Sequence, residues 1–451
     1  MKLSKNMKRS IIMMLVLVST LSASSQKKWS LKDCIDYAMQ NNITLQQARL
    51  QKRSATEDRK QSQAALLPSL SASTNQSVGY RPWLSSGMTT VTNGTVNTKV
   101  NKTYYNGTYG LNASWTVWNG NQNRNQVKLN KVSEEQAELS IAETANSIQE
   151  KIAQLYVQIL YMNEAIRVNK ESLETSKKNE ERGKQILEVG KMSKADLAQL
   201  TAQRSADEYN IVEAESNLAN YKLQLKQLLE ITSDEPFDIE IPTATDEQAL
   251  AAIPSLASVY EKALTIRPEI QNSKLDLQSS DLQMKIAKAG HLPTLSMTGG
   301  LGTNTGSMSG TNWGSQMKTN FDASLGASLN IPIFDNRKTR TAINKAQIQR
   351  EQALLDIQNQ EKQLYSTIEG YWLDANTNQQ KFISSCSTVE SEQASYDLLS
   401  EQFNLGLKNI VELMTGKDKL LNAQQNKLQS KYMTILNQQL LKFYQGEELG
   451  L

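Results

Sequence analysis

The sequence predicts a mixed fold: a membrane β-barrel to which each chain contributes four strands, continued by a long antiparallel α-helical coiled-coil barrel. Three observations predict it. The chain contains an internal repeat, each copy has short stretches in which apolar and polar residues alternate, and each copy has long proline-free stretches with coiled-coil spacing. We therefore expect two copies of one helix–strand–strand–helix–helix unit.

The internal repeat is carried by short segments that match between the two copies. The matching pairs lie 225 or 216 residues apart: 64–71 with 289–296, 115–120 with 331–336, and 187–190 with 403–406. A repeat of roughly 200 residues is too long for a solenoid, so we expect two pseudo-symmetric copies of a larger unit. The first copy is expected over residues 26–235 and the second over residues 256–451, with a linker at residues 236–255.

Composition argues against several function classes. The 49 Lys and Arg residues against 46 Asp and Glu residues give a net charge of +3 and no basic stripe for nucleic acid. One His and two Cys residues leave almost nothing for metal ligation or nucleophilic catalysis, which need clustered reactive side chains. We therefore expect no nucleic-acid partner, no cofactor, no metal and no enzymatic activity. For Cys34 and Cys386 we favour two free thiols, but the sequence alone does not exclude a disulfide.

Residues 1–25 have the pattern of a secretory signal peptide. Basic residues precede an apolar run from Ile11 to Leu21, and small residues follow, with Ala23 three positions before an expected cleavage near Ser25. The apolar run is too short to cross a bilayer as a helix, and no later stretch offers about 18 consecutive apolar residues. We expect an exported chain that is either soluble or a membrane β-barrel.

Each copy should begin with a helix. In the first copy, Ser30 can cap a helix that is expected to run to about Leu66, where Pro68 ends it. Residues 69–118 and 293–334 then each predict a pair of strands, because apolar and polar residues alternate there with a period of two. Strands of about ten residues or a little more can cross an outer membrane when tilted. A soluble hairpin packed on a core is the alternative.

Aromatic residues gather in or beside these strands, as interfacial girdles of membrane strands do. The expected membrane-interface aromatics are Tyr80, Trp83, Tyr109, Trp115, Trp118, Trp313 and Phe334. The segments 81–103 and 303–319 are rich in Gly, Ser, Thr and Asn and are expected to be exposed loops. Together these features predict contact with outer-membrane lipid.

The rest of each copy predicts a hairpin of two long helices. Residues 121–188 and 337–404 contain no proline, and each stretch would extend about 100 Å at 1.5 Å per residue. Apolar residues keep four–three spacing along these stretches and along the helices that return, which is typical of coiled coils. Each hairpin is expected to turn at a glycine, Gly190 in the first copy and Gly406 in the second.

Four strands cannot close a barrel, and lipid tolerates no open sheet edge because unpaired backbone groups in hydrocarbon are costly. Several chains must therefore share one barrel. Three chains would supply twelve strands, and their coiled-coil hairpins would continue the barrel as a tube, which makes a conduit. The pattern alone does not fix the number of chains.

Several short motifs occur in the same order in both copies. They are Trp29-Ser30-Leu31 with Ala38 and Asn42; Leu67-Pro68-Ser69-Leu70 and Leu292-Pro293-Thr294-Leu295; Ile331-Pro332-Ile333-Phe334-Asp335; and Gly190 with Asp196-Leu197 or Gly406 with Glu412-Leu413. With these motifs the chain resembles the TolC-like outer-membrane efflux protein family from about residue 29 to residue 441. Members are homotrimeric exit ducts that work with a periplasmic adaptor and an inner-membrane pump.

The resemblance implies a homotrimer in the outer membrane that extends into the periplasm and passively conducts cargo from its partners to the outside. The pump is expected to be of the resistance-nodulation-division type. Two alternatives stay open. One is a type I protein-secretion duct, and the other is an exported coiled-coil structural or adhesive protein without a channel.

The resemblance also implies a gate at the periplasmic tip. Glu412 matches an acidic position that rings the aperture, and Asp196 and Lys408 match positions of a polar latch between neighbouring coils. Phe403 stands where a latch tyrosine would donate a hydroxyl, and Thr415 stands where a second acidic ring would lie. Three copies of Glu412 near an axis would repel one another, attract cations and raise one another's pKa. The alternative is that these charges are solvated and stabilise helix starts.

Overall fold

The computed structural model describes residues 28–83, 87–91, 94–98, 102–232, 237–242, 244–307 and 309–450. The signal peptide expected at residues 1–25 lies outside these residues. The chain divides into two compact units. The helical unit takes the described parts of residues 1–48, 141–270 and 360–451, and the sheet unit takes those of residues 49–140 and 271–359.

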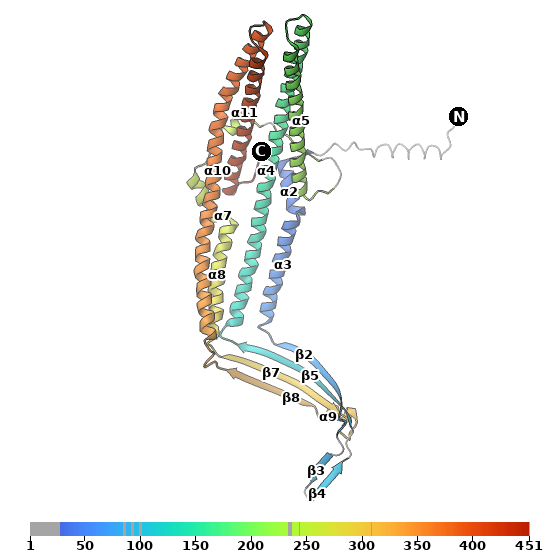
Figure 1. Cartoon of the computed structure of the whole chain (residues 1–451). Coiled ribbons are helices and arrows are strands. Elements are labelled where there is room, and N and C mark those ends of the chain that lie inside the picture. The colour runs from blue at the N-terminus through green and yellow to red at the C-terminus, as the bar shows by residue number, and fades with distance from the viewer. Residues whose placement is uncertain are drawn as a thin grey trace, which may run out of the picture. The chain divides into compact units, whose positions relative to one another are not determined.

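The elements follow the chain in the order labelled in Figure 1. They are β1 (Lys28–Trp29), α2 (Leu31–Asn41), α3 (Ile43–Ala64), β2 (Ser69–Tyr80), β3 (Gly87–Val91), β4 (Gly94–Thr98), β5 (Thr103–Trp118), α4 (Gln122–Glu188), α5 (Lys194–Leu228), β6 (Asp238–Ile239), α6 (Asp246–Ala249), α7 (Leu256–Ile266), α8 (Pro268–Ala289), β7 (Thr294–Gly306), α9 (Trp313–Thr319), β8 (Asp322–Asn330), α10 (Lys338–Asn404) and α11 (Ile410–Tyr444).

The duplication is confirmed at the level of single helices. α4 and α10 both contain 67 residues, and α5 and α11 both contain 35. Equivalent helices begin 216 positions apart, which is the spacing of the matching segments in the sequence. The two long hairpins predicted from heptad spacing are therefore present, and they are equal in length.

The single helix expected from Ser30 to Leu66 is wrong. The chain forms α2, capped by Ser30 through its hydrogen bonds with Asp33, and then α3, with Asn42 in an extended conformation between them. The side-chain oxygen of Asn42 accepts a hydrogen bond from the N–H of Leu45 at 3.2 Å, and its amide donates to the carbonyl of Leu228 at 3.0 Å. Asn42 thus ends one helix and caps the next, which is favourable for this residue type.

The sheet unit holds a four-stranded antiparallel sheet in the order β2–β5–β7–β8, whose strands lie side by side in Figure 1. The register places Ala113, Gly299 and Leu325 in one row across three strands, and Asn112, Gly300 and Ser324 in the next row. One face is therefore apolar and the other carries Ser, Thr, Asn and Gly. The two-residue alternation predicted from the sequence is confirmed.

The apolar face of this sheet is exposed within the chain rather than packed on a core. Leu325 is 80 % exposed, and Leu70 and Leu329 are also exposed. An exposed apolar face of this size is unfavourable in water and calls for an apolar solvent or a partner. This feature favours the membrane interpretation over a soluble hairpin.

The segments expected to be plain loops contain regular structure. β3 and β4 form a two-stranded antiparallel hairpin within residues 81–103. In the other segment β7 continues to Gly306 and α9 follows, and the hydroxyl of Thr303 donates to the carbonyl of Met317 at 2.8 Å. Polar composition concealed these elements, because Ser, Thr and Asn side chains here bond to nearby backbone rather than to water alone.

The core lies in the helical unit. Its fully buried side chains come from α2, α4, α7, α10 and α11, and include Ile152, Ile159, Ile368 and Leu441. The expected linker at residues 236–255 contains β6, which pairs in parallel with β1, and the short helix α6. Cys34 is buried and Cys386 is half-buried, and no disulfide joins them. Among the described residues, no helix combines the length and apolar composition needed to cross a membrane.

Candidate functional site

Two helical hairpins end close together in the helical unit. We call α4–α5 hairpin 1 and α10–α11 hairpin 2. Gly190 and Gly406 turn them with φ of +73° and +75°, and open space lies where a Cβ would be added. Glycine is therefore needed for the left-handed backbone and not for room. In each turn a backbone N–H reaches back five residues, from Lys191 to Ile186 at 3.0 Å and from Leu407 to Gln402 at 2.9 Å, which satisfies the end of the long helix.

Asp196 belongs to the start of α5. Its carboxylate accepts a hydrogen bond from the hydroxyl of Ser193 at 2.7 Å, and its backbone N–H donates to that hydroxyl at 3.0 Å. This reciprocal arrangement is a capping box, and the negative charge also suits the helix N-terminus. Asp196 thus has a structural role within hairpin 1.

Glu412 holds the equivalent position in hairpin 2. Lys408 donates to its carboxylate at 2.8 Å, and the backbone N–H of Asn409 donates to the other oxygen at 3.3 Å. The hydrogen bond from Lys408, followed by that from Asn409, lowers the pKa of Glu412 below its ordinary value. Lys408 and Asp196, the two charges that the resemblance assigns to a latch, each bond within their own hairpin.

Phe403 and Thr415 differ in their surroundings. Phe403 is only 7 % exposed and packs in a small apolar cluster that also contains Leu200 of hairpin 1 and Leu413 of hairpin 2. Thr415 is exposed, and its hydroxyl donates to the carbonyl of Val411 at 2.8 Å. The aromatic ring therefore contributes packing between the hairpins at the position where the family resemblance places a hydroxyl donor.

A cavity of about 290 Å³ lies between the ends of the two hairpins; we call it the tip cavity. Both hairpins line it, with Ile186, Lys191, Met192 and Asp196 from hairpin 1 and Phe403, Asn404, Leu405, Gly406, Lys408, Asn409 and Ile410 from hairpin 2. Asp196 and Lys408 thus face the same space without forming an ion pair with each other among the described contacts. The structure brings most of the predicted tip residues to one place.

The predicted interface aromatics form two groups along the sheet unit. Trp115 and Trp118 lie at the end of β5, where the indole N–H of Trp115 donates to the carbonyl of Leu66 at 2.9 Å. Phe334 follows β8 and is 84 % exposed. At the other end Tyr80 closes β2, and Trp83 follows it with 93 % of its surface exposed.

Tyr109 and Trp313 join the second aromatic group. Their rings meet edge to face with centroids 6.2 Å apart, which ties α9 to β5. Aromatic side chains thus stand at both ends of the apolar face of the sheet, and most of them are exposed. That is the distribution that two membrane interfaces would require.

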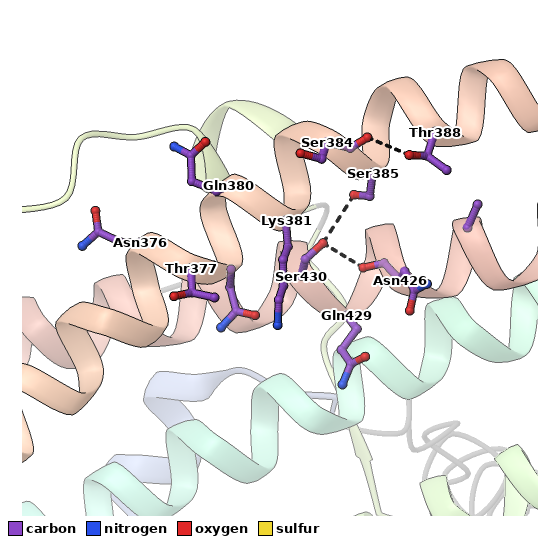
Figure 2. Close-up of a pocket in the computed structure, with 12 residues that line it drawn as sticks. Asn376, Thr377, Gln380, Lys381, Ser384, Ser385, Thr388, Asn426, Gln429 and Ser430 are labelled. Carbon is purple, nitrogen blue, oxygen red and sulfur yellow. Dashed lines mark hydrogen bonds between the residues drawn. The ribbon is translucent and has the colours of Figure 1, made fainter.

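Figure 2 shows a second hollow, a polar groove of about 880 Å³ along α10 and α11. Asn376, Lys381, Ser385 and Ser430 are among the residues that line it, and the hydroxyl of Ser430 donates to the carbonyl of Asn426 at 2.7 Å. Of the residues that line it, only Lys381 carries a charge. Among the described residues no group of three His, Cys, Asp or Glu side chains could hold a metal ion. The groove offers hydrogen bonding but no acid–base pair.

Sequence reasoning missed a buried ionic cluster farther along the hairpins, which we call the Lys417 cluster. Lys417 of α11 forms an ion pair with Asp207 of α5 and donates to the hydroxyl of Ser176 of α4 at 2.7 Å. That hydroxyl donates in turn to Asp207 at 2.6 Å. The side chains of Lys417 and Asp207 are only 5 % and 2 % exposed. A signal was present, since Lys417 stands between Leu413 and Leu420 at coiled-coil spacing, where an apolar residue is expected.

Comparison with known proteins identifies the family. The family described as "Outer membrane efflux protein" matches residues 34–230 and again residues 259–447. The chain belongs to this family. The two matches coincide with the two copies of the repeat, so the family's unit is present twice.

Individual members of the family are similar to the chain at low identity. Outer membrane protein TolC of Escherichia coli (strain K12) is 22 % identical over 363 residues, which cover 74 % of this chain and 73 % of that protein. Outer membrane efflux protein BepC of Brucella suis biovar 1 is 20 % identical over 334 residues, covering 73 % and 70 %. Both alignments extend over most of each protein.

Solved structures of outer-membrane channels share the fold. CusC matches with a TM-score of 0.78 at 17 % identity, covering 93 % of this chain and 92 % of that one. The Campylobacter jejuni CmeC outer membrane channel matches with a TM-score of 0.75 at 20 % identity, covering 93 % and 87 %. The predicted fold class is confirmed. As a family member the chain is an outer-membrane efflux duct that extends into the periplasm, and not a structural or adhesive protein.

Proposed function

We propose that three copies of the chain assemble into one exit duct, which passively conducts small toxic compounds from an inner-membrane pump and a periplasmic adaptor to the outside. The four-stranded sheet carries this proposal. Among the described strands, β2 and β8 each have a single neighbour in that sheet, so each leaves one edge for another chain. Pairing β8 of one copy with β2 of the next would close a barrel, and three copies would give twelve strands.

The two faces of the sheet support the same assembly. The exposed apolar face with aromatic residues at both ends fits lipid, and the Ser, Thr, Asn and Gly face fits a water-filled lumen. Such a duct needs no catalytic step, and we propose that it has none. The gradient and the pump supply the direction of transport.

We propose that the hairpin ends form the periplasmic aperture. In a trimer Glu412 would appear three times near one axis, where carboxylates attract cations. Asp196, Lys408, Phe403 and Thr415 would surround it. The alternative, that these charges only stabilise helix starts, predicts that their removal leaves the aperture unchanged.

We also propose that the adaptor docks on the hairpin ends. Val189 of hairpin 1 and Leu405, Leu407 and Val411 of hairpin 2 are between 56 % and 75 % exposed. Large apolar side chains at a helix turn in an aqueous compartment are suited to a partner's apolar surface. The partner is an adaptor of a resistance-nodulation-division pump; a type I protein-secretion system is the second candidate.

The duct is tested with purified protein. We expect a trimer in detergent, heat-modifiable migration, and discrete cation-selective conductance in a planar bilayer. Adaptor docking is tested separately with Leu407→Glu, which should abolish export in cells while leaving the bilayer conductance unchanged. Val212→Glu is a matched control, because Val212 is also exposed but lies within α5. A monomer without conductance would refute the duct.

A further inference from the structure

The Lys417 cluster links the two hairpins of one chain. Lys417 comes from hairpin 2, whereas Asp207 and Ser176 come from hairpin 1. Two further hydrogen bonds cross between the hairpins nearby: Gln203 donates to Asp418 at 3.1 Å, and Gln425 donates to Asn169 at 2.9 Å. Polar groups therefore make much of the contact between the hairpins in this region.

Stability does not explain why charges are buried here. Moving two charges out of water is costly, and well-packed apolar residues in place of a buried ion pair are often equally stable or more so. The packing around the cluster is also loose. A cavity of about 190 Å³ lies beside Lys417, and the hydroxyl of Ser172, which lines it, is buried without a hydrogen-bond partner. A buried ion pair that lies in loose packing is better explained by specificity, because it fixes one alignment of its partners.

The internal repeat provides a comparison within the same chain. A shift of 216 residues relates Ser176 to Glu392, Asp207 to Ala423, and Lys417 to Thr201. In a ring of three chains, hairpin 2 of one chain would meet hairpin 1 of the next through these equivalent residues. That contact has no cation at the place of Lys417 and no carboxylate at the place of Asp207. The ion pair therefore belongs to the contact within a chain and has no counterpart between chains.

We propose that the Lys417 cluster locks the two hairpins of each chain into one rigid body, so that the periplasmic end of the duct opens at the contacts between chains. The proposal rests on the proposed trimeric duct. Lys417 and Asp207 are positioning residues here, since they act on the aperture only by fixing the hairpins to each other.

A covalent bridge between the hairpins tests the proposal. Lys191 and Leu405 line the tip cavity from opposite hairpins, and both are exposed. The variant Lys191→Cys with Leu405→Cys, made in a Cys34→Ala and Cys386→Ser background, can be bridged by a bismaleimide. A bridge within one chain leaves the denatured protein migrating as a monomer. We expect bridged cells to export ethidium as well as unbridged cells treated with N-ethylmaleimide. Loss of export in the bridged cells alone would overturn the proposal, because the hairpins would then have to separate.

Removal of the lysine gives the complementary result. Lys417→Met should raise the closed-state conductance several-fold, and the bridge should return it to the original value, which a mere loss of folding would not allow. Lys419→Met is the matched control, because Lys419 is exposed on the same helix. Equal conductance of the two variants would overturn the proposal. If Lys417→Met fails to fold, the Asp207→Leu and Lys417→Met double variant carries no unpaired buried charge and serves instead.

The lock can be judged even if the duct proposal fails. If the purified wild-type chain gives no conductance, the proposed function is refuted. The yield of the bridge in detergent still reports on the hairpins, and Lys417→Met should lower it relative to Lys419→Met. An equal yield would overturn the lock.

Discussion

Asn42 and Arg267 occupy equivalent positions 225 residues apart, and each interrupts a helix with nearly the same extended backbone. Their φ and ψ angles are −61° and 126° for Asn42 and −69° and 127° for Arg267. The side chains act differently. Asn42 caps α3 and bonds to Leu228, whereas the guanidinium of Arg267 lies 4.2 Å over the ring of Tyr444. The two copies thus keep one backbone bend and stabilise it with different chemistry.

The bend in the first copy predicts a stability effect. Asn42→Ala removes a helix cap and a buried hydrogen bond, so the helical unit should lose about 1–2 kcal/mol of stability. The expected result is a lower midpoint of thermal unfolding, measured by circular dichroism at the helical band. Gln47→Ala, an exposed position in the same helix, should leave the midpoint unchanged. Equal midpoints for both variants would show that the cap is not needed.

The aperture proposal predicts a change in conductance. Replacing Glu412 and Asp196 together with Ala should raise the closed-state conductance and weaken cation selectivity, because the aperture loses charge and both capping boxes. Single-channel recording in a planar bilayer measures both quantities. Glu401→Ala is the control, because Glu401 is exposed near the end of α10. Unchanged conductance and selectivity would count against the gate residues.

Lys408 predicts a pH effect with a definite sign. Its hydrogen bond lowers the pKa of Glu412 below the ordinary value of 4.5, so the carboxylate keeps its charge as the pH falls to that value and loses it only below. Cation selectivity should follow the same course. In Lys408→Met the pKa of Glu412 rises, and selectivity should be lost at a higher pH than in the wild type. Reversal potentials across a salt gradient, recorded over a pH series, give the comparison; coincident curves would contradict it.

The two faces of β8 predict opposite responses to one substitution. Leu325→Lys places a charge on the exposed apolar face near the middle of the strand, which should cost about 2–4 kcal/mol in lipid. The neighbouring Ser324→Lys points to the polar face and should be tolerated. The amount of heat-modifiable trimer in outer-membrane fractions measures the difference. Equal loss in both variants would argue against a lipid-facing row.

The long hairpins and the strands were predictable because their patterns repeat over many residues. Heptad spacing over residues 337–404 predicted a helix that the structure places at Lys338–Asn404. Alternation over two turns of sequence similarly predicted both faces of the sheet. In such segments each residue supports the same conclusion, so a few exceptions do not obscure it.

Features that depend on one distant partner were not predictable. The bend at Asn42 is stabilised by a bond to Leu228, 186 residues away, and nothing near Asn42 in the sequence announces it. Lys417 and Asp207 are 210 residues apart, and each alone resembles a surface charge on a helix. At the tip, the residues were selected by family resemblance, but their bonds within each hairpin follow from local capping geometry.

The equal lengths of the paired helices constrain how the chain can change. An insertion in α10 alone would carry Gly406 past Gly190 and place the two turns at different heights, so the tip cavity could not form from both hairpins. A length change in one copy therefore requires the same change in the other, and an insertion must also preserve the heptad phase on the outgoing and the returning helix. Lengthening the tube is thus a coordinated event at four places in the sequence.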